Sequence, residues 1–211
     1  DYAREELWHA LRRPMNLSTE VANPGGDHVA VNTPRNSHDL VRFIRLGTLE
    51  ARKMPVEILH AFLEARCEHA ELIFVGGGSS SDPGINAAIT IASESNSRIT
   101  WIQGATDIEV NELIASADVC LALGTEGYGI PVLEAIAAGT PVVYGGTQPA
   151  AELMQGGGAR AHMGLEHENL VDLFQTYAQP GQVEELRSEI DISRIPSWAD
   201  FAISIARSCK S

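Results

Sequence analysis

Cysteine and long apolar runs are both scarce in this sequence, and each shortage excludes a class of protein. The three cysteines, Cys67, Cys120 and Cys209, are far apart and show no Cys-x-x-Cys spacing, which argues against a disulfide or metal framework. Isolated cysteines are typical of a reducing compartment, so we expect a cytoplasmic protein. No apolar run approaches the ~20 residues of a membrane-spanning helix, and we expect neither a signal peptide nor a transmembrane segment.

Positive charge is scarce as well. The chain has 15 lysines and arginines against 28 aspartates and glutamates, a formal net charge of −13. A surface of this sign repels nucleic-acid phosphates and anionic lipid headgroups, so we expect no nucleic-acid partner and no binding to a membrane surface. An anionic ligand would need a local positive site that acts against the overall field.

A regular alternation of predicted strands and helices fills most of the chain. Its 211 residues, 44% of them hydrophobic, suit one large domain with tails. Short apolar runs predict strands over 41–46, 71–75, 98–102, 118–123, 140–144 and, more weakly, 159–163. Helical spacing of apolar residues predicts a helix over 84–94 and others that begin near Pro55 and at a Thr106–Glu109 capping box. The alternation predicts the α/β class, with βαβ units in a doubly wound parallel sheet of Rossmann-like type.

The two ends of the chain differ from this regular part. The opening residues, DYAREELWHALRRP, read as a helix already under way, so we expect a fragment of a longer protein. The loop-rich composition of 22–39 assigns 1–40 to the end of a preceding domain and a linker, and 41–196 to the Rossmann-like domain. Residues 197–211 are expected to form a last helix with an apolar stripe, made of Trp198, Phe201, Ala202, Ile205 and Cys209.

The segment GTEGYGIPVLEA, residues 124–135, contains more glycine and acid than a simple strand-to-helix turn needs. It follows a predicted strand, and ligands of open α/β sheets collect beyond the carboxyl ends of the strands. Gly127 and Gly129 permit a sharp turn and a close approach to a ligand, and Pro131 suits the first position of a helix. The N–H groups of Ile130 and Val132 would then be free to bind an anion such as a phosphate.

Two glutamates eight positions apart, Glu126 and Glu134, complete this segment. Carboxylates accept strong hydrogen bonds from vicinal hydroxyls, which suits a sugar ligand. The alternative is that glycine-rich turns are common in α/β proteins and that a glutamate early in a helix interacts only with the helix dipole. The pattern alone leaves both interpretations open.

The longer segment EGYGIPVLEAIAAGTPVV resembles the signature of the large retaining glycosyltransferase family four, whose members carry two glutamates separated by seven residues. Those enzymes have the two-domain GT-B fold, and the signature belongs to the C-terminal, donor-binding half. The final helix resembles the one that crosses back to the N-terminal domain. Four more segments are similar to the family: GTLEARK (47–53), which is mannosyltransferase-like, ELIFVGGG (71–78), ITWIQGATDIEVNELIASADV (99–119) and TQPAAEL (147–153).

The resemblance implies roles for individual residues. Glu126 would be the catalytic carboxylate that contacts the transferred sugar, and Glu134 would hold the ribose. Arg52 and Lys53 would bind the diphosphate, the arginine as a fork and the lysine as a point charge. The remaining implied contacts are sugar and phosphate at Gly127, Tyr128, Gly129, Ile130 and Val132, and the base at Gln103, Gly104 and Thr106.

The sequence also departs from the family pattern. The segment LALGTEG lacks the Pro-Ser pair that most relatives carry before the first glutamate and is one residue shorter. Thr48 stands where many members have a diphosphate-binding arginine, so Arg52 and Lys53 must do more of that work. Ala51 and Met54 replace the commoner proline and asparagine.

The resemblance implies a retaining transfer of a hexose from a nucleotide-diphosphate sugar to a glycan or lipid-linked acceptor, which a missing N-terminal domain would bind. GDP-mannose is one donor candidate because of the 47–53 segment, and a UDP-sugar is the other. No cofactor and no metal are expected, because cations and a helix end would stabilise the leaving diphosphate. The chain by itself is expected to be inactive. The alternatives are a nucleotide-sugar epimerase of the same fold and a non-catalytic nucleotide-sugar-binding module.

Other features are better explained by structure than by function. The glycine-rich segment 76–84 lacks a Walker lysine and reads as a plain loop rather than a phosphate cradle. His28 lies in the linker and reads as a solvated turn residue, and the acids around His167 read as an exposed first helical turn. The tryptophans are expected to be packing anchors, namely Trp8, Trp101 and Trp198.

Overall fold

The strands found in the structure are those that the apolar runs predicted. The computed structural model describes residues 22–26 and 39–208, so the expected helix at 1–14, His28 and Cys209 lie outside the described residues. The strands are β1 (Val41–Leu46), β2 (Ala70–Val75), β3 (Ile99–Ile102), β4 (Val119–Thr125), β5 (Val142–Thr147) and β6 (Ala159–Ala161).

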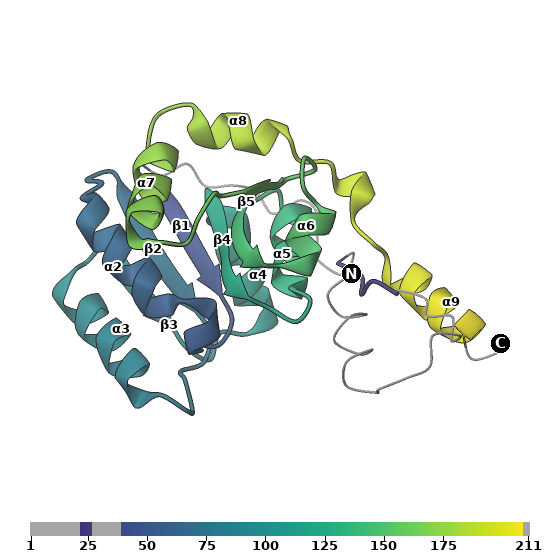
Figure 1. Ribbon diagram of the computed structural model, residues 1–211, viewed down its shortest axis with the longest axis horizontal. Helices are drawn as coiled ribbons and strands as arrows, with labels where there is room; N and C mark the ends of the chain where they lie inside the picture. The colour runs from purple at the N-terminus through teal and green to yellow at the C-terminus, as the bar shows by residue number, and fades with distance from the viewer. Residues whose placement is uncertain (1–21, 27–38, 209–211) are drawn as a thin grey trace.

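Helices connect these strands in sequence and complete the alternating pattern (Figure 1). The α-helices are α2 (Pro55–Ala65), α3 (Pro83–Ser95), α4 (Asp107–Ser116), α5 (Ile130–Ala137), α6 (Pro149–Leu153), α7 (His167–Tyr177), α8 (Gln182–Ser188) and α9 (Trp198–Ser208). Two short 3-10 helices are η1 (Ala51–Lys53) and η2 (Ile192–Arg194).

The sheet is parallel at every pairing and has the strand order β3-β2-β1-β4-β5-β6. The chain builds one half outward from β1 and then returns to the centre to build the other half from β4. This order is the doubly wound arrangement that the alternation of strands and helices predicted.

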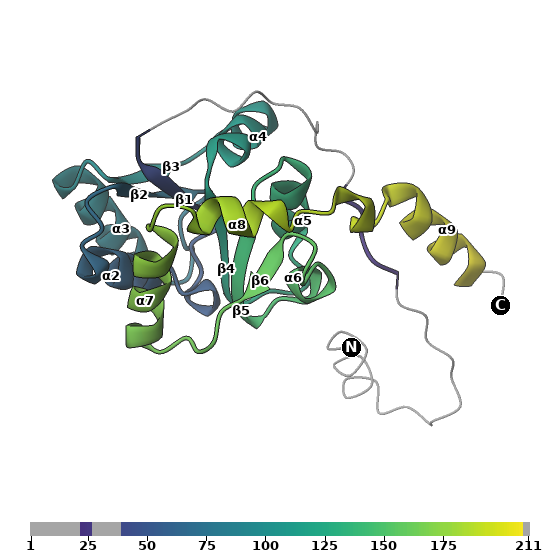
Figure 2. The same ribbon diagram turned by 90° about the horizontal axis from the view of Figure 1, so that it is seen from above.

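Two apolar cores lie on opposite faces of the sheet. On one face α2, α3 and α7 bury their apolar sides, and Phe174 meets Phe43 and Phe62 edge to face, with ring centroids 4.9 and 5.3 Å apart. On the other face α4, α5 and α6 pack against the sheet. Figure 2 shows α4 on the opposite side of the sheet from α2, α3 and α7. Covering both faces explains why the strands are almost wholly apolar.

Several local predictions are confirmed and others need correction. Thr106 and Glu109 form the expected capping box at the start of α4. The helical spacing of apolar residues after Pro55 includes Leu63, which indicates a buried position, but Leu63 is 42% exposed. The strands β4 and β5 run further than predicted, because Thr125 pairs with Thr147 beyond their apolar residues.

The last helix, α9, begins at Trp198, one residue after the expected start, and lies outside the sheet-and-helix layers in both views (Figures 1 and 2). Within it Trp198 and Phe201 stack edge to face at 5.6 Å, while Ile205 is 47% exposed. Across the described residues, none of the helices has the length and apolar character required to span a bilayer.

Candidate functional site

The predicted sugar and phosphate residues gather where the strand order changes direction. β1 and β4 are neighbours at the centre of the sheet, and their ladder consists of the pairs Phe43↔Val119 and Ile44↔Cys120. Beyond these pairs, each strand continues into a loop at the same edge of the sheet. Such a switch point is the usual ligand site of an open α/β sheet.

Close packing joins the two loops. Gly124 in β4 has φ +88, and a Cβ built on it would lie 2.2 Å from the carbonyl oxygen of Arg52. Only glycine allows both this backbone conformation and this approach. The 3-10 helix η1, which carries Arg52 and Lys53, therefore rests directly on the end of β4.

The two predicted cations are paired with the predicted catalytic glutamate. Lys53 Nζ lies 2.8 Å from Glu126 Oε2, and Arg52 Nη1 lies 3.1 Å from Glu126 Oε1. Arg52 Nη1 also donates to the carbonyl of Thr125 at 2.6 Å, and its Nε pairs with Glu50 at 2.6 Å. The backbone N–H of Gly127 donates to Glu126 Oε1 at 3.0 Å.

These contacts determine the charge state of Glu126. Partial burial acts to raise the pKa of its carboxyl, but hydrogen bonds from Lys53, the Gly127 backbone and Arg52 outweigh it and lower the pKa to about 2. Glu126 is therefore a carboxylate at neutral pH. It can accept hydrogen bonds from sugar hydroxyls but cannot donate a proton.

The start of α5 differs from the prediction. The helix begins at Ile130, so Pro131 is its second residue and not its first. The N–H of Val132 is not free, because it donates to the carbonyl of Gly129 at 2.9 Å. The left-handed conformation of Gly129, φ +99, turns that carbonyl into the first turn of the helix. The helix end thus offers fewer free N–H groups to an anion than the sequence indicated.

Tyr128 lies between these loops as a packing residue. Its ring is half-buried against the α5 face of the sheet, its carbonyl accepts from Ala150 N at 2.9 Å, and burial raises the pKa of its hydroxyl to about 12. The Tyr128 carbonyl is thus already used by α6. Glu134 lies further along α5 and is half-buried.

The predicted base-binding residues lie on the loop between β3 and α4. Gln103 and Gly104 are exposed and line a cavity of about 500 Å³. The Thr106 hydroxyl is used locally, since it donates to Glu109 Oε2 at 2.8 Å. In the described part of the chain, this cavity shares no lining residue with the small cavity beside Glu126.

The glycine-rich segment after β2 is a plain loop, as predicted. Asn86 accepts from Ser79 N at 2.7 Å and donates to the Ser79 carbonyl at 2.8 Å. This side chain ties the loop to the start of α3. Trp101 is also structural, because its ring packs on the core and its Nε1 donates to Gly76 O at 3.0 Å.

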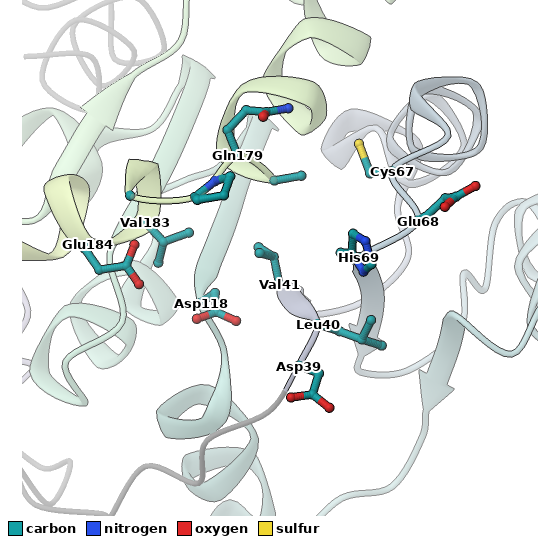
Figure 3. Close-up of a pocket in the computed structure, with 13 residues that line it drawn as sticks. Asp39, Leu40, Val41, Cys67, Glu68, His69, Asp118, Gln179, Val183 and Glu184 are labelled. Carbon is teal, nitrogen blue, oxygen red and sulfur yellow. The ribbon is translucent and has the colours of Figure 1, made fainter.

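A cavity of about 630 Å³ lies at the opposite, amino ends of the strands (Figure 3). Figure 3 shows carboxylates of Asp39, Asp118 and Glu184 around it. Negative charge of this kind repels phosphate, so size alone does not make this cavity a nucleotide site. Among the residues described, no group of three or more histidine, cysteine, aspartate or glutamate side chains is arranged to hold a metal ion.

Residues 41–194 match the family Glycosyl transferases group 1. The chain belongs to this family. The serotype-specific mannosyltransferase WbdA of Escherichia coli is 29% identical in an alignment 147 residues long, which covers 65% of this chain but 18% of WbdA. The glycosyltransferase chain is thus similar to a small part of that relative.

Solved glycosyltransferase structures share the fold. WaaG, involved in lipopolysaccharide biosynthesis, matches with a TM-score of 0.61 at 21% identity, over 78% of this chain and 47% of WaaG. Anabaena HepE, solved with UDP and glucose, matches with a TM-score of 0.66 at 20% identity, over 82% of this chain and 48% of HepE. The chain therefore spans about half the length of these structures and has the fold expected for one half of a GT-B enzyme.

Two buried polar residues beside the site of this group 1 glycosyltransferase were missed from the sequence. Gln148 is 4% exposed and its Nε2 donates to Gly124 O at 3.2 Å, which ties the loop after β5 to β4. Arg45 is 6% exposed and lies in β1. A signal for Arg45 was present, because an arginine inside the apolar run VRFIRL is unusual for a strand covered on both faces.

Proposed function

We propose that this chain is the donor-binding half of a retaining hexosyltransferase that uses a nucleotide-diphosphate sugar. The observation that carries this proposal is the pairing of Glu126 with Arg52 and Lys53 at the switch point of the sheet. It puts a permanent carboxylate and two cations side by side, which are the groups that a sugar and a diphosphate need. The mannosyltransferase name of WbdA supports a hexose as the transferred group.

Binding of the donor would rearrange this ion cluster. Arg52 and Lys53 would turn from Glu126 to the diphosphate, and the released carboxylate would accept hydrogen bonds from the sugar hydroxyls. As the bond from sugar to phosphate breaks, positive charge develops on the sugar and negative charge on the leaving diphosphate. Glu126 and the two cations would stabilise these charges where they form.

The other predicted contacts keep their roles in this proposal. Glu134 would hold the ribose, the backbone of Gln103, Gly104 and Thr106 would face the base, and that of Gly127–Ile130 would lie beside the sugar. GDP-mannose and a UDP-sugar are the two donor candidates. The acceptor, a glycan or a lipid-linked sugar, would bind to a second domain.

Calorimetric titration of GDP, UDP and their hexose sugars into this chain tests donor binding. We expect one nucleoside diphosphate to bind, and Arg52→Ala with Lys53→Ala to weaken it by about 3 kcal/mol, since charge-assisted contacts are lost. Arg66→Ala with Arg207→Ala is the matched control, because it removes the same charge at exposed positions away from the site. Equal affinity of the folded Arg52 and Lys53 double variant would contradict the assignment.

Turnover by the full-length protein distinguishes the remaining alternatives. A transferase releases nucleoside diphosphate only as an acceptor is glycosylated, an epimerase changes the donor sugar without an acceptor, and a binding module does neither. We expect acceptor-dependent release, with the anomeric configuration of the donor retained in the product by NMR. Inversion of that configuration would contradict the retaining mechanism.

A further inference from the structure

Arg45 is a buried charge without a counter-ion in contact with it. It is 6% exposed, and its Nε has no hydrogen-bond partner among the described residues. Within the same residues, no carboxylate lies within ion-pair distance of its guanidinium, whereas Arg42 on the same strand pairs with Glu71 at 2.5 Å. A buried cation that no carboxylate contacts is costly, so its presence here calls for a physical reason.

The thiol of Cys120 does not supply that reason. Of the groups that raise the pKa of Arg45, Cys120 has the largest effect, ahead of Glu126, but burial raises the pKa of this thiol to about 12. At neutral pH Cys120 is therefore uncharged. Burial lowers the pKa of Arg45 only to about 10, so the guanidinium keeps its positive charge.

The guanidinium lies at the site described above. Its Nη1 and the Nζ of Lys53 are 3.8 and 3.2 Å from the point where a Cβ on Gly47 would stand. Arg45 also lines a cavity of about 20 Å³ together with Glu126, Gly129 and Pro131. This cavity has room for about one water molecule but not for a phosphate, so a phosphate at the site could not reach Arg45 through it.

The charge balance of the cluster shows what Arg45 adds. Arg52 and Lys53 are matched by the two carboxylates that they contact, Glu50 and Glu126. Without Arg45 the cluster would have no net charge, and the chain as a whole carries −13. The N-terminal end of α5 adds little positive potential for an anion, because the Val132 N–H is already bonded to Gly129 O.

We propose that Arg45 supplies the net positive charge that draws the diphosphate of the nucleotide into this site, acting across one water molecule rather than by contact. The inference rests on the donor-binding function proposed above. Arg45 is thus a positioning residue. Its positive charge would substitute for the diphosphate-binding arginine that many family members have at the position of Thr48. A buried charge is little screened by solvent, so it acts on the phosphates over several ångströms.

The test measures nucleoside and nucleoside-diphosphate affinity in the same variants. Arg45→Met removes the charge and keeps the apolar length of the side chain, Arg45→Lys keeps the charge, and Arg45→Gln is a second neutral variant. Arg160→Met is the matched control, because it removes one strand arginine, which lies in the edge strand β6 and pairs with Glu189. The ligands are GDP and UDP with guanosine and uridine, titrated into this chain and into the full-length protein.

We expect Arg45→Met and Arg45→Gln to bind the preferred nucleoside diphosphate on the order of 10- to 100-fold more weakly than the wild type. This is the size of the Coulomb attraction that is lost when a charge near the phosphates is removed at an effective dielectric constant of about 20. Binding of the nucleoside should change less than about twofold, because that ligand carries no phosphate charge. Arg45→Lys should recover part of the loss, and Arg160→Met should bind as the wild type does. The melting temperature of Arg45→Met should equal or exceed that of the wild type, since an unpaired buried charge is removed.

Three results would overturn the inference. They are unchanged diphosphate affinity in Arg45→Met, an equal loss for nucleoside and diphosphate, and a failure of both neutral variants to fold, which would make Arg45 a structural residue. Failure of the proposed function is seen separately, because the wild-type protein would then bind neither GDP nor UDP.

Discussion

Lys53 Nζ lies 2.8 Å from Glu126 Oε2, so the lysine expected to hold the diphosphate and the glutamate expected to hold the sugar form an ion pair with each other. Each group neutralises the other. In the proposed function, the donor would supply hydroxyls for the carboxylate and phosphates for the lysine at the same time. A nucleotide without its sugar would satisfy only the cations.

This pairing leads to different expectations for the two glutamates. Glu126→Gln should lower kcat of the full-length enzyme by about 100-fold or more, because the lost charge acts in the transition state. Its affinity for the free nucleoside diphosphate should be unchanged or higher, since Lys53 and Arg52 are then unpaired. Calorimetry of this chain and kinetics of the full-length protein measure the two effects.

Glu134→Gln should show the opposite pattern. A ribose contact exists in both the substrate and the product, so its loss should raise the donor KM and the nucleoside-diphosphate Kd more than it lowers kcat. If Glu126→Gln weakens the free nucleotide as much as Glu134→Gln does, the sugar and ribose roles are wrongly assigned.

The pKa of Glu126 predicts how stability changes with pH. Its folded value of about 2 is below the ordinary value of 4.5, so its ion pairs stabilise the fold above pH 4.5 and lose this effect as the pH falls towards 2. Because solvent screens this partly exposed carboxylate, we expect a contribution of about 1 kcal/mol. In urea unfolding, the free energy of unfolding of the wild type should exceed that of Glu126→Gln by about this amount at pH 6, and most of the difference should be lost at pH 2.5. An advantage that is the same at both pH values would contradict the assigned ion pairs.

The contact between β4 and η1 predicts a large effect of a single methyl group. Gly124→Ala should destabilise the fold by about 3 kcal/mol, since its Cβ would lie 2.2 Å from the Arg52 carbonyl at a φ of +88. Gly127→Ala is the control, because nothing lies within 4 Å of its Cβ and its φ is not positive. Thermal unfolding of both variants should separate them clearly. Equal melting temperatures would mean that the two loops are not packed as described.

Arg66 offers a stabilising substitution away from the site. It ends α2 in the left-handed conformation with φ 51 and is exposed, so Arg66→Gly should raise the free energy of unfolding by about 0.5–1 kcal/mol. His60→Gly, at an exposed position inside the same helix, should instead lower it by about 0.5 kcal/mol. Neither variant should alter nucleotide affinity, and a loss of stability in Arg66→Gly would contradict the backbone conformation of this cap.

Local sequence patterns predicted much of this fold because they act over short distances. The apolar run at 41–46, the Thr106–Glu109 capping box and the turn after β4 each involve neighbouring residues, and the structure confirms them. Predictions that depended on backbone detail were less accurate. The sequence does not show that the Gly129 carbonyl accepts a hydrogen bond from the Val132 N–H, because this bond depends on the backbone conformation of Gly129 at the start of α5.

The α/β class, the order of strands and helices along the chain, and the residue types around the switch point follow from the residue pattern alone. Packing of the folded chain is needed to bring Arg52 to Glu126, 74 positions away, and to bury Arg45 beside the same small cavity as Glu126. Those relations depend on β1 and β4 being adjacent in the sheet although α2, β2, α3, β3 and α4 separate them in the chain. Charge pairing acts over a few ångströms in space and leaves no periodic pattern along the sequence, so it becomes visible only once the strands are packed.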